Sequence, residues 1–152
     1  MKRRNAHWAV LLLLLGVAPA FAHVRGTSPD FYYAGGTELF PSGCGGNLEL
    51  SQVALTFRCS QGSVTIPYRS ITLMQYRPQL SSEVRHLKLD WKIKPDGTHA
   101  KRNVLFTVVY KQGESTRALV LKVRPQNMRP YLAEIELDSR KRIQVWDYRG
   151  YD

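Results

Sequence analysis

The sequence has few of the side chains on which most catalytic and metal sites depend. It contains two cysteines and four histidines among 152 residues, and no H-x-x-x-H or H-E-x-x-H spacing occurs. A G-x-S-x-G nucleophile elbow and a glycine-rich phosphate loop that opens a helix are also missing. These absences argue against a metal site, a cofactor site and an active site. We therefore expect that the protein is not an enzyme and uses no cofactor.

Long hydrophobic runs are missing after the first 22 residues. The apolar run Leu11–Leu15 follows a basic start that includes Lys2, and it precedes the small-x-small sequence Ala20-Phe21-Ala22. A basic start, a short apolar middle and a small-residue end are typical of a cleavable signal peptide. We expect residues 1–22 to direct export through the Sec pathway to the periplasm or the cell exterior.

The two cysteines lie in two alternating segments that fold back on each other. In an oxidising compartment, an even number of closely spaced cysteines favours a disulfide, here Cys44–Cys59. A chain reversal at residues 51–52 would place Leu48 opposite Leu55 and Cys44 opposite Cys59, all on one face. No histidine or further cysteine lies in this hairpin to complete a metal site.

Acidic residues are outnumbered by basic ones. The chain has 22 Lys and Arg against 12 Asp and Glu, and its formal charge of +10 falls to +7 without Lys2, Arg3 and Arg4. Outside the cytosol, a basic surface favours anionic envelope lipids or polysaccharides as partners over nucleic acid. The alternative is that dispersed Lys and Arg only keep a small domain soluble.

Seven segments have the apolar alternation or β-branched composition typical of strands. Pro67 puts the third of them at an edge or leaves the side of that strand where the N–H would point unpaired, because proline cannot donate to a strand ladder. The last two are apolar on both faces and should be central in the sheet. The seven segments are residues 44–50, 53–59, 64–68, 71–76, 87–93, 104–110 and 117–123.

The apolar period changes from two to about 3.6 after residue 123. Met128, Tyr131 and Ile135 fall on one face, which predicts an amphipathic helix with Asn127 as its N-cap. Residues 23–43, with Phe31-Tyr32-Tyr33, lack a sustained period, and we expect them to form an extended N-terminal arm. Residues 143–148 alternate again, and we expect residues 142–152 to form a C-terminal tail that either extends along the sheet or hangs off it.

Seven antiparallel strands followed by one C-terminal helix resemble the pleckstrin-homology (PH) superfold, in which the helix closes the open corner of a bent sheet. The run Val64–Ile71 resembles the opening of bacterial PH-like and GRAM-like domains. The signal peptide together with Gly43–Leu50, Met74–Pro78 and Met128–Ile135 resembles small exported acidobacterial-type proteins of unknown function. The resemblance implies a mainly β (α+β), PH-like domain over residues 44–141 and implies no catalytic residue.

The resemblance also has a departure that bears on ligands. Phosphoinositide-binding PH domains carry a basic loop between their first two strands, whereas the corresponding loop here, Leu50–Val53, has no Lys or Arg. Lipid headgroup binding at that loop is therefore not expected.

We expect a non-catalytic module that binds a peptide or protein partner in the cell envelope, at a sheet edge or in the groove between helix and sheet. Tyr68 and Arg77 are candidate contacts, together with Tyr76 and Trp91, which also lie at core spacing. One alternative is binding of anionic lipid or polysaccharide by an exposed basic face. This face contains Lys88, Lys92 and Lys94 on one strand and extends to Arg85, Lys101 and Arg102. Another is an assembly role of the aromatic arm.

Overall fold

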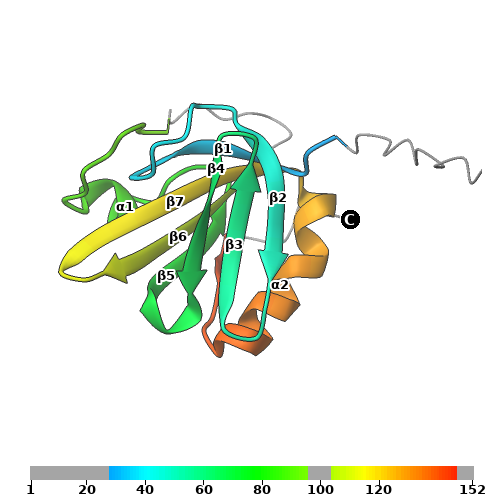
Figure 1. Ribbon diagram of the computed structural model, residues 1–152. Helices are drawn as coiled ribbons and strands as arrows, with labels where there is room; N and C mark the ends of the chain where they lie inside the picture. The colour runs from blue at the N-terminus through cyan, green and yellow to red at the C-terminus, as the bar shows by residue number, and fades with distance from the viewer. Residues whose placement is uncertain (1–27, 96–103, 147–152) are drawn as a thin grey trace, which may run out of the picture.

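The computed structural model describes residues 28–95 and 104–146, which form an eight-stranded sheet and two α-helices (Figure 1). The mainly β fold with a C-terminal helix is confirmed, whereas the predicted signal peptide lies outside the described residues. The strands are β1 (Phe31–Gly36), β2 (Gly45–Leu50), β3 (Ala54–Cys59), β4 (Gly62–Pro67), β5 (Ile71–Arg77), β6 (Val104–Gln112), β7 (Ser115–Val123) and β8 (Gln144–Val145).

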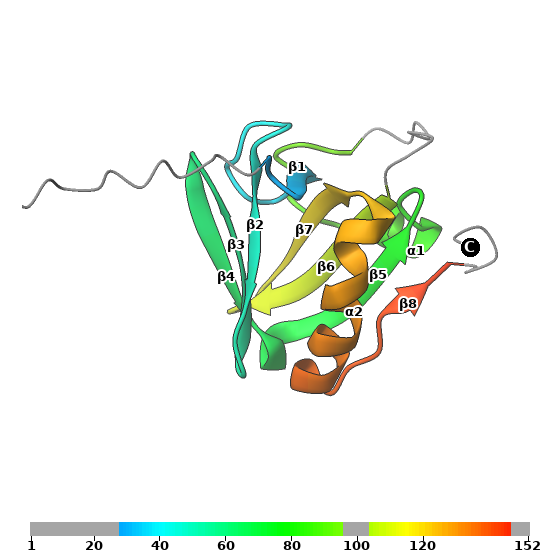
Figure 2. The same cartoon turned by 90° about the vertical axis from the view of Figure 1, so that its right-hand side faces the viewer.

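The strand order is β4-β3-β2-β1-β7-β6-β5-β8, and every neighbouring pair is antiparallel except β5 and β8. A 3-10 turn, η1 (Tyr68–Ser70), links β4 to β5, and the helices are α1 (Ser82–His86) and α2 (Pro125–Ser139). Figures 1 and 2 show β2, β3 and β4 running at a steep angle to β5, β6 and β7, so the sheet is strongly bent.

The Cys44–Cys59 disulfide is confirmed, with 6.0 Å between the two Cα atoms. The predicted register of this hairpin is wrong by two residues, because Gly46 and not Cys44 lies opposite Cys59. The chain reverses one residue later than expected, where the Ser51 N–H donates to the carbonyl of Ala54 at 3.0 Å. A shift of two residues keeps every side chain on its expected face. The two cysteines therefore still lie on the same face and form the predicted disulfide.

The segment expected to be an N-terminal arm contains a strand. β1 pairs with β2 on one side and with β7 on the other, and Phe31 and Tyr33 are fully buried. Gly36 has a φ of +147° and approaches β7 so closely that a Cβ there would lie 2.2 Å from the Ala118 carbonyl oxygen. Glycine at this position therefore permits the pairing and does not mark a linker.

The predicted strand 87–93 is not a strand of the sheet. The segment follows α1 and crosses the face of β6 and β7, where Leu87, Leu89 and Trp91 pack against a second hydrophobic cluster that includes Val109 and Val120. Its pairing with the sheet is an isolated bridge between Ile93 and Gly36. The alternation correctly identified the buried side of the segment, but burial against a neighbouring layer produces the same period as a half-buried strand.

Two clusters of apolar side chains cover the two faces of the β6–β7 pair. The larger contains Phe106 and Leu121 together with Met128 and Ile135 of α2, while the smaller lies beneath α1. This double cover explains why the two strands are apolar on both faces, and their interior position in the sheet is confirmed.

Helix α2 begins two residues before the expected N-cap. Arg124 occupies the N-cap position and Pro125 opens the first turn, where its missing N–H leaves no intrahelical bond unmade. Asn127 instead donates from its side chain to the Asp30 carboxylate at 2.7 Å. This bond joins the helix to the residue that precedes β1, an arrangement the sequence pattern did not indicate.

Two residues of α2 test how much the helix contributes to stability. Ile135 is fully buried and Leu137 is 77% exposed. We expect Ile135→Ala to lower the free energy of unfolding by about 2–5 kcal/mol, because it leaves a cavity in the core. Leu137→Ala, the matched control, should change it by less than about 0.5 kcal/mol. Equal effects of the two changes in urea titrations would contradict the packing of α2 on the sheet.

Candidate functional site

β4 presents an open edge, as Pro67 predicted. Within the described chain, β4 pairs with β3 and with no other strand. Cys59 and Gly62 are opposite each other across a two-residue turn, and the residues that flank such a turn exchange ladder hydrogen bonds. The alternation then directs the backbone N–H and C=O groups of Ser63 and Thr65 away from β3, toward the open edge.

A second free edge faces the first. The pairing of β5 with β6 starts at Ile71 and Tyr110, so Lys111 and Gln112 extend past the end of β5 and pair with β7 alone. β5 starts late because η1 occupies the three residues after β4. We call the gap between Ser63–Thr65 and Lys111–Gln112 the open seam.

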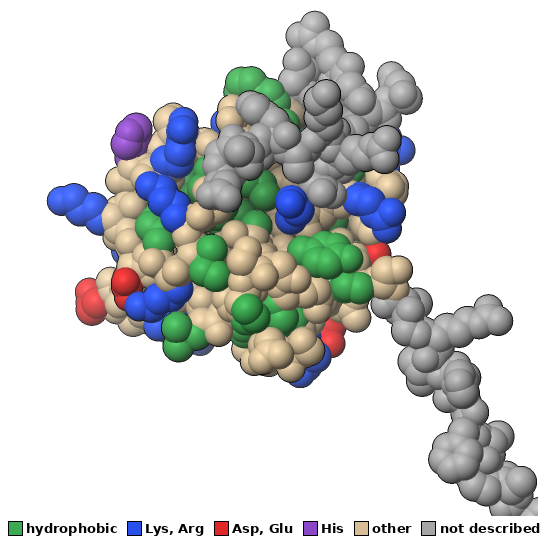
Figure 3. Space-filling model, turned by 90° about the horizontal axis from the view of Figure 1, so that it is seen from above, with side chains coloured by type: hydrophobic (Ala, Val, Ile, Leu, Met, Phe, Trp, Pro, Cys, Tyr) green, Lys and Arg blue, Asp and Glu red, His purple; other side chains and the backbone are tan. Residues whose placement is uncertain are grey.

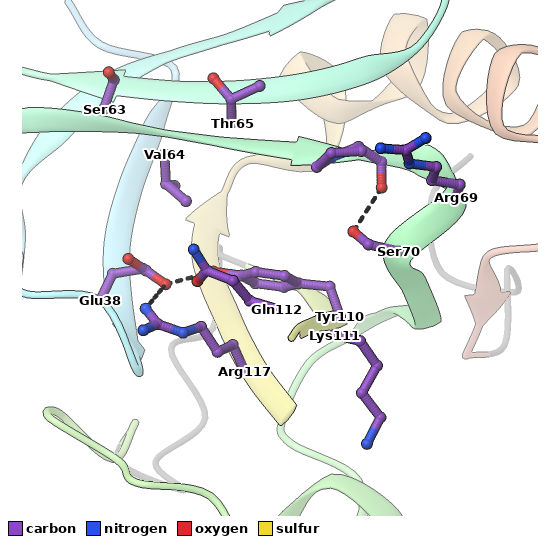
Figure 4. Close-up of a pocket in the computed structure, with 11 residues that line it drawn as sticks. Glu38, Ser63, Val64, Thr65, Arg69, Ser70, Tyr110, Lys111, Gln112 and Arg117 are labelled. Carbon is purple, nitrogen blue, oxygen red and sulfur yellow. Dashed lines mark hydrogen bonds and ion pairs between the residues drawn. The ribbon is translucent and has the colours of Figure 1, made fainter. Parts of the chain in front are cut away.

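The open seam holds a cavity of about 600 Å³ (Figure 4). Figure 4 shows Val64 pointing toward a cluster of Glu38, Tyr110 and Arg117, while Lys111 points away from that cluster. The cavity is lined by Glu38, Ser63, Val64, Thr65, Pro67, Arg69, Ser70, Tyr110, Lys111, Gln112 and Arg117.

Glu38 organises the wall opposite β4. Its carboxylate accepts a short hydrogen bond from the Tyr110 hydroxyl and a bond of 3.2 Å from the Arg117 guanidinium. The Tyr33 hydroxyl donates to the Glu38 carbonyl oxygen at 2.9 Å. The Glu38 side chain is 15% exposed. This network ties the loop after β1 to β6 and β7, and it gives the cleft a fixed wall.

Burial and the charge of Glu38 keep the tyrosines of this wall protonated. Burial, and then the nearby carboxylate, raise the pKa of Tyr33 to about 12. Burial also raises the pKa of Tyr110, and the hydrogen bond to Glu38 raises it further. Both hydroxyls therefore remain hydrogen-bond donors beyond pH 10, where an ordinary tyrosine ionises.

The cleft carries more positive than negative charge. Arg69, Lys111 and Arg117 line it, and Glu38 is the one acidic residue among the lining residues that the structure describes. Because the Glu38 charge is already paired with Arg117, Arg69 and Lys111 set the sign of the field for an entering group.

The predicted contact residues are not gathered at this cleft. Tyr68 is only 4% exposed, and burial together with Asp138 and Glu134 of α2 raises its pKa to about 12. Arg77 lies at the far end of β5 and stacks on Trp146. Tyr76 is buried, and Trp91 packs against the hydrophobic cluster that includes Val109 and Val120. None of these four residues lines the open seam.

Lys88, Lys92 and Lys94 are exposed at alternate positions of the segment after α1. Lys92 forms an ion pair with Asp90. In the view of Figure 3, the Lys and Arg side chains that can be seen are scattered among hydrophobic and uncharged ones. Lys101 and Arg102, which the sequence suggested as an extension of this basic face, fall in the gap between the described ranges.

Glu38, Tyr110 and Arg117 were not recognised from the sequence. The two bonds of the Glu38 carboxylate span 72 and 79 residues, and no short motif encodes such a separation. The available signal was Glu38 itself, a charged residue between an aromatic strand and Phe40. A strand interpretation of Phe31–Gly36 would have put Glu38 at the end of a central strand.

No protein-family model and no curated protein matches the chain. Among the residues that the structure describes, no group of three or more His, Cys, Asp or Glu is placed to hold a metal ion. Neither α1 nor α2 has the length and apolar character needed to cross a membrane. The geometry of the open seam is therefore the basis for the functional interpretation.

The link between Glu38 and the tyrosines can be tested by alkaline titration. The folded-state pKa of Tyr33 is about 12 against 10.0 without the fold, so its contribution to stability is complete below pH 10 and is lost as the pH rises toward 12. We expect Glu38→Gln to lower the pKa of Tyr33 and Tyr110, and phenolate absorbance should appear at lower pH.

Glu49→Gln is the matched control, since Glu49 pairs with Arg58 at an exposed position of β2 and β3. It should leave the titration unchanged. An identical phenolate curve for Glu38→Gln and the unmodified protein would contradict the assigned network.

Proposed function

We propose that this protein is a non-catalytic interaction module that binds an extended segment of a protein partner by strand addition to β4 in the open seam. The observation that carries the proposal is the pair of facing free edges around one cavity. Backbone groups at an open edge provide affinity for an extended peptide, and pockets for alternate side chains provide specificity.

The size and walls of the seam suit such a segment. A cavity of about 600 Å³ falls in the usual range of ligand sites. One peptide edge would bond to Ser63 and Thr65, and side chains on one face would contact Val64 and the wall formed by Glu38. An added strand also removes the exposed edge of β4, which is a hazard for aggregation.

Charge narrows the class of partner. Arg69 and Lys111 line the seam without an ion pair to any described residue, so Asp or Glu side chains at alternate positions of the peptide would meet complementary charge. We infer that the partner segment is acidic. Electrostatic complementarity of this kind mainly raises the association rate and excludes basic competitors.

The topology supports the PH-like assignment, which stays a proposal. Seven antiparallel strands, β1 to β7, precede α2 in the chain. The helix packs on the inside of the bent sheet. The seventh antiparallel strand is β1 and not residues 87–93, and β8 adds a short parallel strand. The basic N-terminus followed by an apolar run supports export to the periplasm or beyond, and the disulfide is compatible with an oxidising compartment.

Strand addition can be tested at Thr65, whose N–H faces the open edge. We expect Thr65→Pro to weaken binding roughly tenfold, because proline removes one edge donor and leaves the β3 ladder intact. The probes are short fluorescent peptides in which Glu alternates with Val, and the measurement is fluorescence anisotropy. Matching peptides with Lys in place of Glu should bind more weakly.

Thr65→Val is the control variant, since both changes remove the hydrogen bond between the Thr65 and Thr56 hydroxyls. It should bind as the unmodified protein does. Equal binding by Thr65→Pro at an unchanged melting temperature would rule out strand addition at β4.

A second candidate function is binding of anionic lipid or polysaccharide by Lys88, Lys92 and Lys94. The exposure of all three on one segment favours it. We expect the triple Lys→Glu variant to lose sedimentation with vesicles that contain anionic phospholipid, in a salt-dependent manner. The triple Lys→Arg variant keeps the charge and should retain it. Unchanged sedimentation of the Glu variant would reduce these lysines to solvated surface.

A further inference from the structure

A second cavity lies at the opposite end of β5 from the open seam. It has a volume of about 510 Å³ and is bounded by the end of β5, the start of α1 and the residue after β8. Its lining residues are Arg77, Pro78, Gln79, Leu80, Ser81, Ser82, Arg85 and Trp146. Two guanidinium groups, one indole and two apolar side chains thus surround one space.

The Arg77 guanidinium lies over the Trp146 indole. Its central carbon lies 5.0 Å from the centroid of the indole ring, a distance typical of a cation–π contact. The backbone N–H of Trp146 donates to the Tyr76 carbonyl at 3.2 Å, which fixes the indole beside β5. Trp146 nevertheless stays 57% exposed, so part of the indole is available to a ligand.

The Arg77 guanidinium has bonding capacity that the described protein does not use. Its Nε is buried and has no hydrogen-bond partner there. A buried donor without a partner costs free energy, and such groups in folded proteins normally meet a ligand or an ordered water. The nearby carboxylate of Glu83 accepts from the Gln75 side chain at 3.2 Å and is not among the residues that line the cavity.

The charge of the cavity is therefore positive. None of the described lining residues is acidic, whereas Arg77 and Arg85 are both basic. A planar guanidinium that is stacked on an aromatic ring presents its edge to a ligand, and two parallel N–H groups on that edge match the two oxygens of a carboxylate.

We propose that this cavity binds a carboxylate that is attached to an apolar or aromatic group. The carboxylate would accept hydrogen bonds from the Arg77 guanidinium edge, with Arg85 adding charge. The apolar group would lie against Leu80 and the exposed part of Trp146. This site is separate from the strand-binding seam, and its ligand is either a free organic acid or the C-terminal residue of a peptide.

Phenylacetate is the first probe, and phenylacetamide is its uncharged counterpart. We expect phenylacetate to shift the NMR signals of the Arg77 Nε–H and of the Trp146 indole N–H. Phenylacetamide should bind at least roughly tenfold more weakly than phenylacetate. Peptides that end in phenylalanine, with a free or an amidated C-terminus, form a second arm. Tighter binding of the free-carboxylate peptide than of phenylacetate identifies a peptide as the source.

Arg77→Lys tests the assignment because it keeps the charge but removes the Nε–H and the planar fork. It should weaken phenylacetate binding roughly tenfold, and Arg69→Lys in the seam should not. If Arg77→Lys lowers the melting temperature, Trp146→Ala is used as the test variant instead, because Trp146 is largely exposed. Equal binding of phenylacetate and phenylacetamide, or full binding by the Arg77 and Trp146 variants, would overturn the proposal.

Discussion

The insertion of β1 between β2 and β7 is the interaction on which the rest of the structure depends. Without it, β2–β3–β4 and β5–β6–β7 would be two separate antiparallel meanders. The register of β1 with β7 brings Gly36 against Leu119, and the next residue, Thr37, exchanges hydrogen bonds with Ala118. The same register carries Glu38 to Tyr110 and Arg117, so the wall of the open seam is a direct consequence of this pairing.

The seam stays open because of how the chain passes from β4 to β5. Pro67 ends β4 without an N–H to donate, and η1 then turns the chain, closed by a hydrogen bond of 2.8 Å from the Ser70 hydroxyl to the Pro67 carbonyl. The Tyr68 N–H donates to the Val53 carbonyl at 2.9 Å, which ties this turn to the loop between β2 and β3. The turn is thus closed on itself and anchored at its start, and β4 and β5 diverge instead of pairing.

Local patterns predicted much of the fold because several strand pairs join segments that are consecutive in the chain. The hairpins from β2 to β4 and from β6 to β7 join consecutive segments, and the 3.6-residue period of α2 reports a buried face directly. One error of the sequence interpretation arose because two different structures produce the same alternation of apolar and polar residues. Leu87, Leu89 and Trp91 alternate because they cover a neighbouring layer, whereas β1 was hidden by Gly35 and Gly36, which are needed for close packing.

The candidate site was less predictable than the fold for a related reason. Its residues come from the loop after β1, from β4 and η1, and from the end of β6 and the start of β7, and only the strand order brings them together. The sequence suggested Tyr68 as a candidate contact because it lies near an edge strand, and Arg77 because it lies at the end of a strand. Burial removes Tyr68 from the surface, while Arg77 faces a different partner, the indole of Trp146.

The positions of the basic residues say more about binding than the net charge of the domain does. Arg69 and Lys111 stand beside free backbone edges, and Arg77 and Arg85 line an apolar cavity. A cation next to unsatisfied backbone groups attracts an acidic chain and lets hydrogen bonds fix its register, whereas a cation on an open face attracts any anion equally. The proposed selectivity therefore depends on the two cavities, where a basic side chain lies next to backbone or aromatic groups of fixed position.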